Sequence, residues 1–313
     1  MLRPVLLMCA ALGPLVGAEG ALHSPPAVLS VRGPEGWREW WRADRAPVRW
    51  RQPLPAVAGA VEWRRLAPGV RWGELLLSGE GEAWRVRAIL VELEPGKVRL
   101  ETRMLQRPDG GPLRWTVDSA PPEAIVAINA GQFTSAGPWG WLVRSGEETR
   151  PPGSGPLAPA LVVDTAGAAR LVPPDSLAAW RGDPTVREAF QSYPALLAGD
   201  GEIPLPLRLP GLGVDLDHRD ARLALGLDRG GRLLIAITRF EGLGGALSNL
   251  PFGLTTPEMA ALMGALGCRR SMLLDGGISS QMRLRLPGGE TRAWRGIRRV
   301  PLGLVVLPAG TER

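Results

Sequence analysis

The clearest helix pattern in this chain spans residues 255–267, and it stands alone among short strand-like runs. Thr255 and Glu258 have the spacing of a capping box, and Pro257 suits the first helical position. Gly267 fits the C-terminal cap. One apolar stripe lies between these signals, at Met259, Leu262, Met263 and Leu266. So little helical periodicity excludes an all-helical bundle and a regular βαβ fold.

Most other apolar residues fall in alternating or continuous runs of strand length. These runs occupy residues 84–93, 97–103, 124–128, 160–163, 168–172, 223–227, 232–240, 271–274, 278–286 and 300–307. Pro95-Gly96 and the segment 228–231 each lie between two runs and predict hairpin turns. The pattern therefore predicts an α+β fold, with a mixed, mainly antiparallel β-sheet core and a few packed helices.

The composition supports a folded protein and excludes several chemistries. Of 313 residues, 45% are hydrophobic, which is enough for a buried core in one large or two small domains. Only 2 Cys and 2 His are present, which excludes a disulfide scaffold, a zinc finger and a His-rich metallohydrolase centre. The net charge of +6 comes from arginine scattered among acids, so no specific nucleic-acid partner is expected.

The amino terminus has the features of an export signal. Arg3 precedes an apolar stretch from Val5 to Val16, and Val16-Gly17-Ala18 offers small residues to a signal peptidase. We expect residues 1–18 to be a signal peptide and the mature protein to be periplasmic or extracellular. The alternative is an uncleaved membrane anchor. The stretch is shorter than the ~20 residues that cross a bilayer. No second long apolar segment follows, so no transmembrane segment is expected after cleavage.

Residues 19–80 form a Pro-, Arg- and Trp-rich arm, and residues 81–313 form a second unit that carries the strand pattern. Four aromatic side chains of the arm lie close together in sequence: Trp37, Trp40, Trp41 and Trp50. Indole faces stack on sugar rings, but a Trp cluster more often packs a segment onto the body of a domain. Packing is the favoured interpretation.

Two reactive side chains lack the surroundings that nucleophilic catalysis requires. His218 has no G-x-S-x-G elbow to accompany it, which argues against a serine hydrolase. Cys268 follows the carboxyl end of the predicted helix, where the helix dipole disfavours a thiolate, and we expect it to be a packed apolar residue. The segment Gly242-Leu243-Gly244-Gly245 offers backbone amides to phosphate but lacks the Lys-Ser/Thr of a P-loop.

An acidic cluster is formed by Asp215, Asp217, His218 and Asp220. Its spacing does not match the calcium-loop pattern, which places glycine at the sixth position. A solvated loop is the favoured interpretation, and calcium binding stays open as the alternative.

The segment Leu274–Ser280 leaves a buried strand and carries an acid between two apolar runs. Asp275-Gly276-Gly277 is typical of a hairpin turn. It is equally typical of a site, because a strand end fixes the Asp275 carboxylate and glycine lets a substrate approach the backbone. Ser279 and Ser280 would then donate hydrogen bonds to substrate oxygens. The residues alone support both interpretations.

Four motifs occur in this chain in the order found in one family. They are Ile128-Asn129-Ala130-Gly131, Gln191-Ser192-Tyr193-Pro194-Ala195-Leu196, Arg222-Leu223-Ala224-Leu225-Gly226, and the stretch from Gly253-Leu254-Thr255 to Leu274-Asp275-Gly276-Gly277. Over residues 121–307 the chain resembles the phosphodiester glycosidase family. The resemblance implies hydrolysis of a sugar-1-phosphodiester, which releases the sugar and leaves a phosphomonoester, on an envelope or extracellular glycan.

The resemblance places Asn129, Arg222 and Asp275 in the catalytic site. Substrate-binding residues implied by the same motifs are Gly131, Gln191, Gly276, Gly277 and Ser280. Arg222 would clamp the phosphodiester, and Asp275 would act as nucleophile or general base at the anomeric carbon. Asn129 would hydrogen-bond a sugar hydroxyl or a phosphate oxygen. Glu258 is the candidate for a second, acidic carboxyl, although the capping box already gives it a structural role.

Two motifs depart from the family pattern. Arg222-Leu223 stands where the family has Arg-Thr, and Leu273-Leu274-Asp275-Gly276-Gly277-Ile278 stands where it has Asn-Leu-Asp-Gly-Gly-Gly. Without that Asn the segment lacks a polar group, and without the third Gly a substrate has less room to approach the turn. An exported glycosidase is the expected function, with no cofactor required beyond the open question of calcium. The alternative is a non-catalytic glycan- or envelope-binding protein that uses the same cleft.

Overall fold

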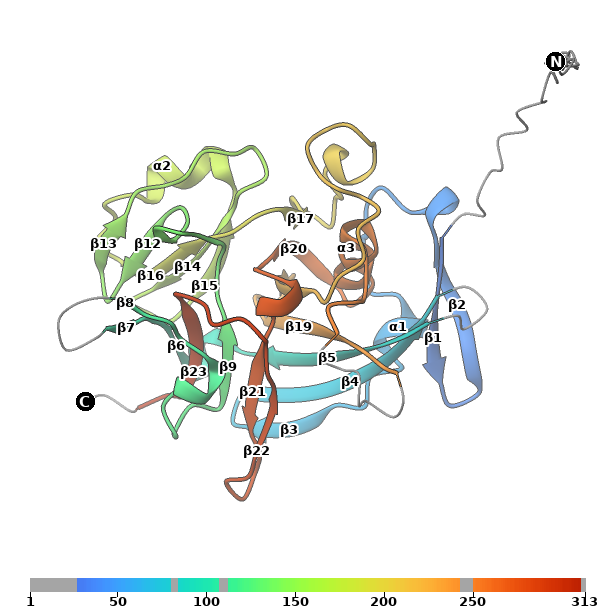
Figure 1. The fold of residues 1–313 in the computed structure, drawn as a ribbon, viewed down its shortest axis with the longest axis horizontal. Coiled ribbons are helices and arrows are strands. Elements are labelled where there is room, and N and C mark those ends of the chain that lie inside the picture. Colours follow the sequence, from blue (N-terminus) through green and yellow to red (C-terminus); the bar gives the residue numbers. More distant parts are fainter. Residues whose placement is uncertain (1–26, 80–83, 107–111, 243–249, 311–313) are drawn as a thin grey trace, which may run out of the picture.

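The computed structural model of the protein describes residues 27–79, 84–106, 112–242 and 250–310. The expected signal peptide, residues 1–18, and most of the Gly242–Gly245 segment lie outside these residues. A large sheet runs through the molecule, with smaller sheets on one side and a helix, α3, on the other (Figure 1).

The large sheet has nine strands in the described part of the chain. Their order is β17-β20-β18-β19-β5-β4-β1-β2, with β3 paired to β4, and every pairing is antiparallel. The strands are β17 (Ala195–Leu197), β20 (Cys268–Leu273), β18 (Leu223–Asp228), β19 (Leu233–Phe240), β5 (Arg85–Leu93), β4 (Val70–Ser78), β1 (Val28–Gly33), β2 (Gly36–Arg42) and β3 (Arg64–Ala67).

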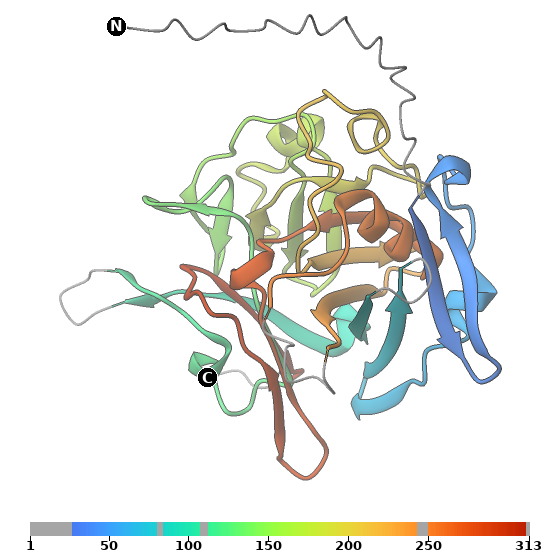
Figure 2. The ribbon, with the colours of Figure 1, turned by 45° about the vertical axis from the view of Figure 1, so that its right-hand side comes forward.

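Two five-stranded antiparallel sheets complete the core. One contains β13 (Glu147–Arg150), β12 (Leu142–Arg144), β16 (Val186–Gln191), β14 (Ala160–Asp164) and β15 (Ala169–Val172). The other contains β22 (Thr291–Trp294), β21 (Met282–Arg285), β9 (Val126–Asn129), β23 (Gly303–Pro308) and β6 (Val98–Arg103). The β21–β22 hairpin projects from the body of the molecule (Figure 2).

The remaining described elements are short. Two strand pairs stand apart from the sheets: β7 (Leu105–Gln106) with β8 (Pro112–Leu113), and β10 (Phe133–Thr134) with β11 (Gly137–Pro138). The α-helices are α1 (Pro55–Ala58), α2 (Leu177–Trp180) and α3 (Thr256–Ala265). The sequence expectation of an α+β fold, dominated by antiparallel strands with few helices, is confirmed. None of the described helices has the length and apolar character needed to span a bilayer.

Both faces of the large sheet are buried, because alternate side chains enter different cores. In β18, Leu223 and Leu225 contribute to the core shared with the two five-stranded sheets, whereas Ala224 belongs to the core beneath α3. The same alternation occurs in β19, where Ile235 and Ala236 enter opposite cores. The central strands are therefore fixed from both sides, and their ends provide rigid points for functional side chains.

Helix α3 begins as the sequence predicts but is more deeply buried than expected. The capping box is present: Glu258 N donates to Thr255 Oγ1 at 3.3 Å, and Thr255 N donates to Glu258 Oε2 at 2.9 Å. The expectation of a single apolar stripe is wrong, because nine of the ten helical residues are buried. Small residues explain this burial, since a Cβ at Gly264 would lie 2.2 Å from the Trp50 ring.

Of three hairpin interpretations, one is confirmed and two are wrong. Residues 228–231 join β18 to β19 as an antiparallel pair. Pro95-Gly96 does not form a hairpin, because β5 stays in the large sheet while β6 pairs with β23. The hairpin interpretation of Asp275-Gly276-Gly277 is also wrong, since β20 and β21 belong to different sheets. These turn residues do reverse or bend the chain, but burial decides which sheet the next strand joins.

The amino-terminal arm supplies strands to the large sheet rather than lying apart from it. Residues 28–78 contribute β1 to β4. Trp41 is buried, and the partly buried rings of Trp40 and Trp50 lie 6.4 Å apart on the core beneath α3. Packing of these three indoles is thereby confirmed. A domain division at residue 80 stays a prediction.

Candidate active site

A cleft of about 580 Å³ opens at the edge of the large sheet where β18 begins and β20 ends. These strands are antiparallel neighbours, with Ala224 opposite Leu273, so the residues beyond each end meet at one edge. Leu274 N donates to Leu223 O at 2.8 Å and continues this alignment. The lining includes Gln132, Phe133, Thr134, Trp139, Ser154, Tyr193, Val214, Asp215, His218, Asp220, Arg222, Thr256, Leu274, Asp275 and Gly276.

Asp275 is a half-buried carboxyl in this cleft. Its backbone is held on both sides: Asp275 N donates to Gly131 O at 3.3 Å, and Asn129 Nδ2 donates to Asp275 O at 2.8 Å. Its Oδ2 is buried without a hydrogen-bond partner in the described structure. Burial raises the pKa of Asp275, and the charge of Asp220 raises it further, while Ser279 and Arg298 act in the opposite direction.

Asp220 is a second carboxyl in the same cleft, and sequence reasoning did not select it as a site residue. Its Oδ1 accepts from Ala221 N at 2.8 Å, and its Oδ2 lies 3.7 Å from His218 Nε2. Burial raises the pKa of Asp220, although the nearby Arg222 guanidinium lowers it. The sequence placed Asp220 in an acidic loop cluster. The signal that points to the site instead is its place two residues before Arg222, at the same strand end.

Other members of the acidic cluster have local roles. Asp215 Oδ1 accepts from the backbone N–H groups of Asp217 and His218, each at 3.0 Å, and these bonds lower the pKa of Asp215. Within the described ranges, no three His, Cys, Asp or Glu side chains are grouped to hold a metal ion. Cys268 is buried, as expected, and burial raises the pKa of its thiol.

Arg222 forms part of the cleft wall, and the protein backbone fixes its direction. Its Nε donates to Leu254 O at 2.8 Å and its Nη2 donates to His218 O at 2.6 Å. Neither bond uses Nη1. Burial lowers the pKa of Arg222, and the nearby charges of Asp220 and Asp215 oppose that shift. A guanidinium held this way retains donors for an anionic oxygen in the cleft.

Three predicted site residues are buried and bonded to backbone instead of lining the cleft. Asn129 is fully buried, and its Oδ1 accepts from Gln281 N at 2.9 Å while its Nδ2 binds Asp275 O. Gln191 fixes the loop after β13 through bonds to Gly153 and Ala158 at 2.8 to 3.0 Å. Ser280 is buried and donates to Ala221 O at 3.4 Å. Their contacts hold the elements that carry the cleft.

The predicted glycines lie where backbone and side chains approach closely. Gly131 has φ +63°, and its carbonyl accepts from Asp275 N. A Cβ at Gly276 would lie 2.8 Å from Ala221 O. Gly277 has φ +58°, and a Cβ there would lie 2.6 Å from Asp220 Oδ2. The last contact shows that the turn after Asp275 packs directly on the Asp220 carboxylate.

Gly277→Ala is expected to lower turnover about 10²-fold, because the new methyl group displaces the Asp220 carboxylate. Gly231→Ala is the matched control, since Gly231 has φ +80° and open space around it. Both variants should lose about 1–3 kcal/mol of stability from left-handed backbone strain. Thermal unfolding and kcat measured side by side test this. Equal activity in the two variants would mean that turnover does not depend on the position of the Asp220 carboxylate.

Glu258, the sequence candidate for a second acid, is occupied by structural bonds. Arg219 Nη1 and Nη2 each lie 2.6 Å from one of its carboxylate oxygens, and Thr255 N donates to Oε2. Glu258 is 1% exposed. It anchors α3 to the loop that carries Asp220, and it does not line the cleft.

Two carboxyls facing one cleft beside a fixed cation are typical of sites that cleave glycosidic bonds. The profile of the phosphodiester glycosidase family matches residues 122–307, and the chain belongs to this family. The resemblance seen in the sequence motifs is confirmed. None of the curated proteins compared with the chain matches it.

Solved structures share the fold. The catalytic domain of zebrafish N-acetylglucosamine-1-phosphodiester alpha-N-acetylglucosaminidase, auto-inhibited by its pro-peptide, has TM-score 0.57 and 17% identity over 85% of this chain and 92% of that chain. A hypothetical protein from Synechocystis has TM-score 0.53 and 16% identity over 89% and 67%. A protein of Burkholderia pseudomallei has TM-score 0.53 and 13% identity over 83% and 100%.

Proposed function

We propose that this protein is an exported hydrolase that cleaves a sugar-1-phosphodiester linkage on an envelope or extracellular glycan. The observation that carries the proposal is the placement of Asp220, Asp275 and Arg222 in one cleft at the edge of the large sheet. Family membership supports the reaction class. The signal peptide expected from the sequence of residues 1–18 supports the location.

The two carboxyls are proposed to carry opposite protonation states. Burial raises the pKa of Asp220, but the neighbouring charges of Arg222 and His218 oppose that shift and favour its ionised form. Burial raises the pKa of Asp275, its Oδ2 has no hydrogen-bond partner among the described residues, and the charge of Asp220 raises the pKa further, so Asp275 keeps its proton to higher pH. Asp220 then serves as nucleophile or as base toward water at the anomeric carbon, and Asp275 protonates the leaving oxygen. This exchanges the role that the sequence suggested for Asp275.

Arg222 is proposed to hold the phosphodiester while the bond between the anomeric carbon and the phosphate oxygen breaks. Its guanidinium offsets the negative charge that develops on the leaving phosphomonoester. Asn129 acts as a positioning residue in this scheme, because its amide fixes the backbone carbonyl of Asp275 rather than reaching the cleft. Gly131 has the same role through Asp275 N.

The direct test is release of free sugar from a panel of sugar-1-phosphodiesters that includes UDP-N-acetylglucosamine. We expect equal amounts of free sugar and phosphomonoester from at least one substrate. Parallel reactions with calcium and with chelator address the calcium question. A well-folded sample that binds these compounds without cleaving any of them would contradict the hydrolase and favour a binding protein.

A further inference from the structure

Two isoleucines near the turn formed by Asp275, Gly276 and Gly277 are exposed to solvent. Ile278 directly follows Gly277 and is 42% exposed, and Ile297 is 67% exposed. The two segments lie side by side, because Arg298 N donates to Ile278 O at 2.9 Å. The chain after β22 returns past this turn in both ribbon views (Figures 1 and 2). Large apolar side chains exposed next to one another at a site indicate contact with an apolar partner.

The segment that carries Ile297 reaches the cleft lining through Arg298. The Arg298 guanidinium lies 4.8 Å from the centre of the Phe133 ring, and Phe133 lines the cleft. The charge of Arg298 also acts to lower the pKa of Asp275, against the larger effect of burial. An aromatic side chain of the cleft lining and a cationic side chain next to Ile297 are therefore in contact.

A second segment that reaches the cleft has exposed leucines. Leu209 and Leu212 are 49% and 46% exposed, on the segment that leads to Gly213 and Val214 in the cleft lining. Tyr193 Oη donates to Gly213 O at 3.1 Å and holds this segment at the cleft. Exposed apolar side chains thus occur on two segments that reach the cleft.

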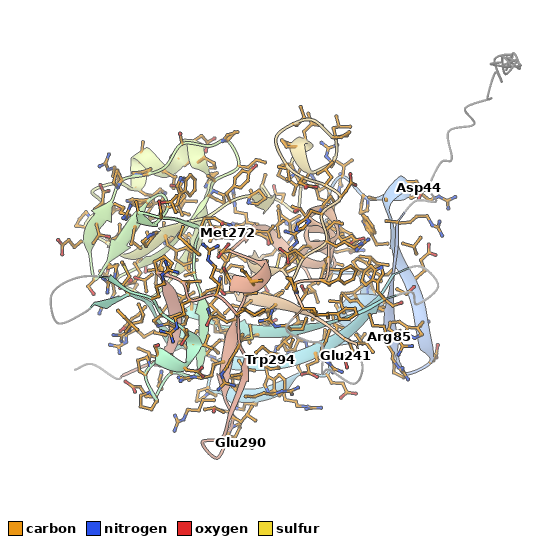
Figure 3. All side chains as sticks on the ribbon, in the orientation of Figure 1. Asp44, Arg85, Glu241, Met272, Glu290 and Trp294 are labelled. Carbon is orange, nitrogen blue, oxygen red and sulfur yellow. The ribbon has the colours of Figure 1, made fainter. Side chains whose placement is uncertain are left out.

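Charge next to the isoleucines is positive. Arg298 and Arg299 are exposed beside Ile297, and Arg295 completes the group, with its own ion pair to Asp118 at 2.8 Å. The segment leaves the β21–β22 hairpin just after Trp294, which is labelled on that hairpin in Figure 3. Exposed apolar side chains flanked by arginine suit the boundary of an anionic bilayer, where isoleucine enters the acyl region and arginine remains at the headgroups.

We propose that Ile278, Ile297, Arg298 and Arg299, here named the isoleucine rim, dock on an anionic lipid surface. The inference rests on the proposed function and deepens it: the substrate is a sugar-1-phosphodiester whose aglycone is a lipid alcohol held in that surface. Docking places the phosphodiester beside Arg222 and Asp275 while the lipid chain stays in the bilayer.

The test compares binding of the purified protein to phosphatidylglycerol-containing vesicles and to phosphatidylcholine vesicles by co-sedimentation. Ile297→Ser and Ile278→Ser are each expected to weaken binding to the anionic vesicles about tenfold, because each removes a buried aliphatic side chain from the bound state. Leu250→Ser is the control, since Leu250 is 45% exposed but lies on the segment between β19 and α3. High salt weakens the contribution of the arginines to vesicle binding but leaves that of the isoleucines. This difference distinguishes docking by the isoleucine rim from nonspecific attraction of a basic protein to an anionic surface.

The outcomes separate the rim from the reaction. Asp275→Asn protein that binds vesicles normally, with loss of binding only in the isoleucine variants, supports the rim. Ile297→Ser should also slow cleavage of a vesicle-bound sugar phosphodiester while leaving a water-soluble one unchanged. Equal loss of binding in Leu250→Ser would overturn the proposal. So would a dimer that Ile297→Ser dissociates without any change in vesicle binding. Vesicle binding without sugar release would instead contradict the proposed hydrolase and leave the rim in place.

Discussion

Asp275→Asn is expected to reduce sugar release about 10³-fold or more while the protein stays folded. The amide has nearly the same shape as the carboxyl, and the backbone bonds to Gly131 and Asn129 do not involve the side chain. The amide of the variant, unlike the carboxyl, cannot exchange a proton at the pH of the assay. Steady-state rates on the best substrate of the panel measure the loss, with circular dichroism to check the fold.

Asp275→Asn is also expected to stabilise the folded protein at neutral pH, although it lowers activity. Burial raises the pKa of Asp275 in the folded state, so its protonated form is favoured there. The protonated Asp275 carboxyl contributes fully to folding stability at low pH, and this contribution is lost as the pH rises through the raised pKa of Asp275. Asp275→Asn removes that loss, and its melting temperature should match wild type in acid and exceed it at neutral pH.

Asp217→Asn is the matched control for both measurements, because Asp217 is exposed on the neighbouring loop. It should change neither turnover nor the pH dependence of melting. Turnover retained in Asp275→Asn would remove Asp275 from the chemistry. A melting temperature that falls at neutral pH would mean that the ionised carboxylate stabilises the fold.

The sequence predicts local structure well where a short segment determines its own conformation. The capping box of α3 and the 228–231 hairpin depend on residues within a few positions of one another, and both are present. Pro95-Gly96 and Asp275-Gly276-Gly277 carry equally strong turn signals, yet each turn passes the chain between two sheets. Local chemistry bends the backbone there, and the partner strand depends on contacts far away in sequence.

The candidate site shows the same limit. Asp275 follows a buried strand, and this pattern alone identifies it as a possible site residue. Asn129 and Gln191 belong to motifs of the family, but only the fold shows that their amides bond to backbone groups. Asp220 lies in a loop among other acids, and its selection as the second carboxyl requires the close packing of Gly277 against it.

Asp220→Asn is expected to lower turnover about 10²- to 10⁴-fold and to shift the pH profile of what remains. In wild type, activity should rise as Asp220 ionises and fall as Asp275 loses its proton, giving a bell-shaped dependence of kcat/KM. Removing the negative charge of Asp220 removes one of the causes that raise the pKa of Asp275. The acidic limb should therefore disappear, and the alkaline limb should move to lower pH.

The double variant Asp220→Asn/Asp275→Asn provides the control for this prediction. If the two carboxyls act together in the same bond-cleavage step, the double variant should be about as slow as the slower single variant, because either loss already breaks the unit. If the fold-losses of turnover in the two single variants multiply in the double variant, the two carboxyls act independently. If the pH profile of Asp220→Asn keeps its acidic limb and loses the alkaline one, the roles of the two carboxyls are the reverse of those proposed. An unshifted alkaline limb would show that the charge of Asp220 does not act on Asp275.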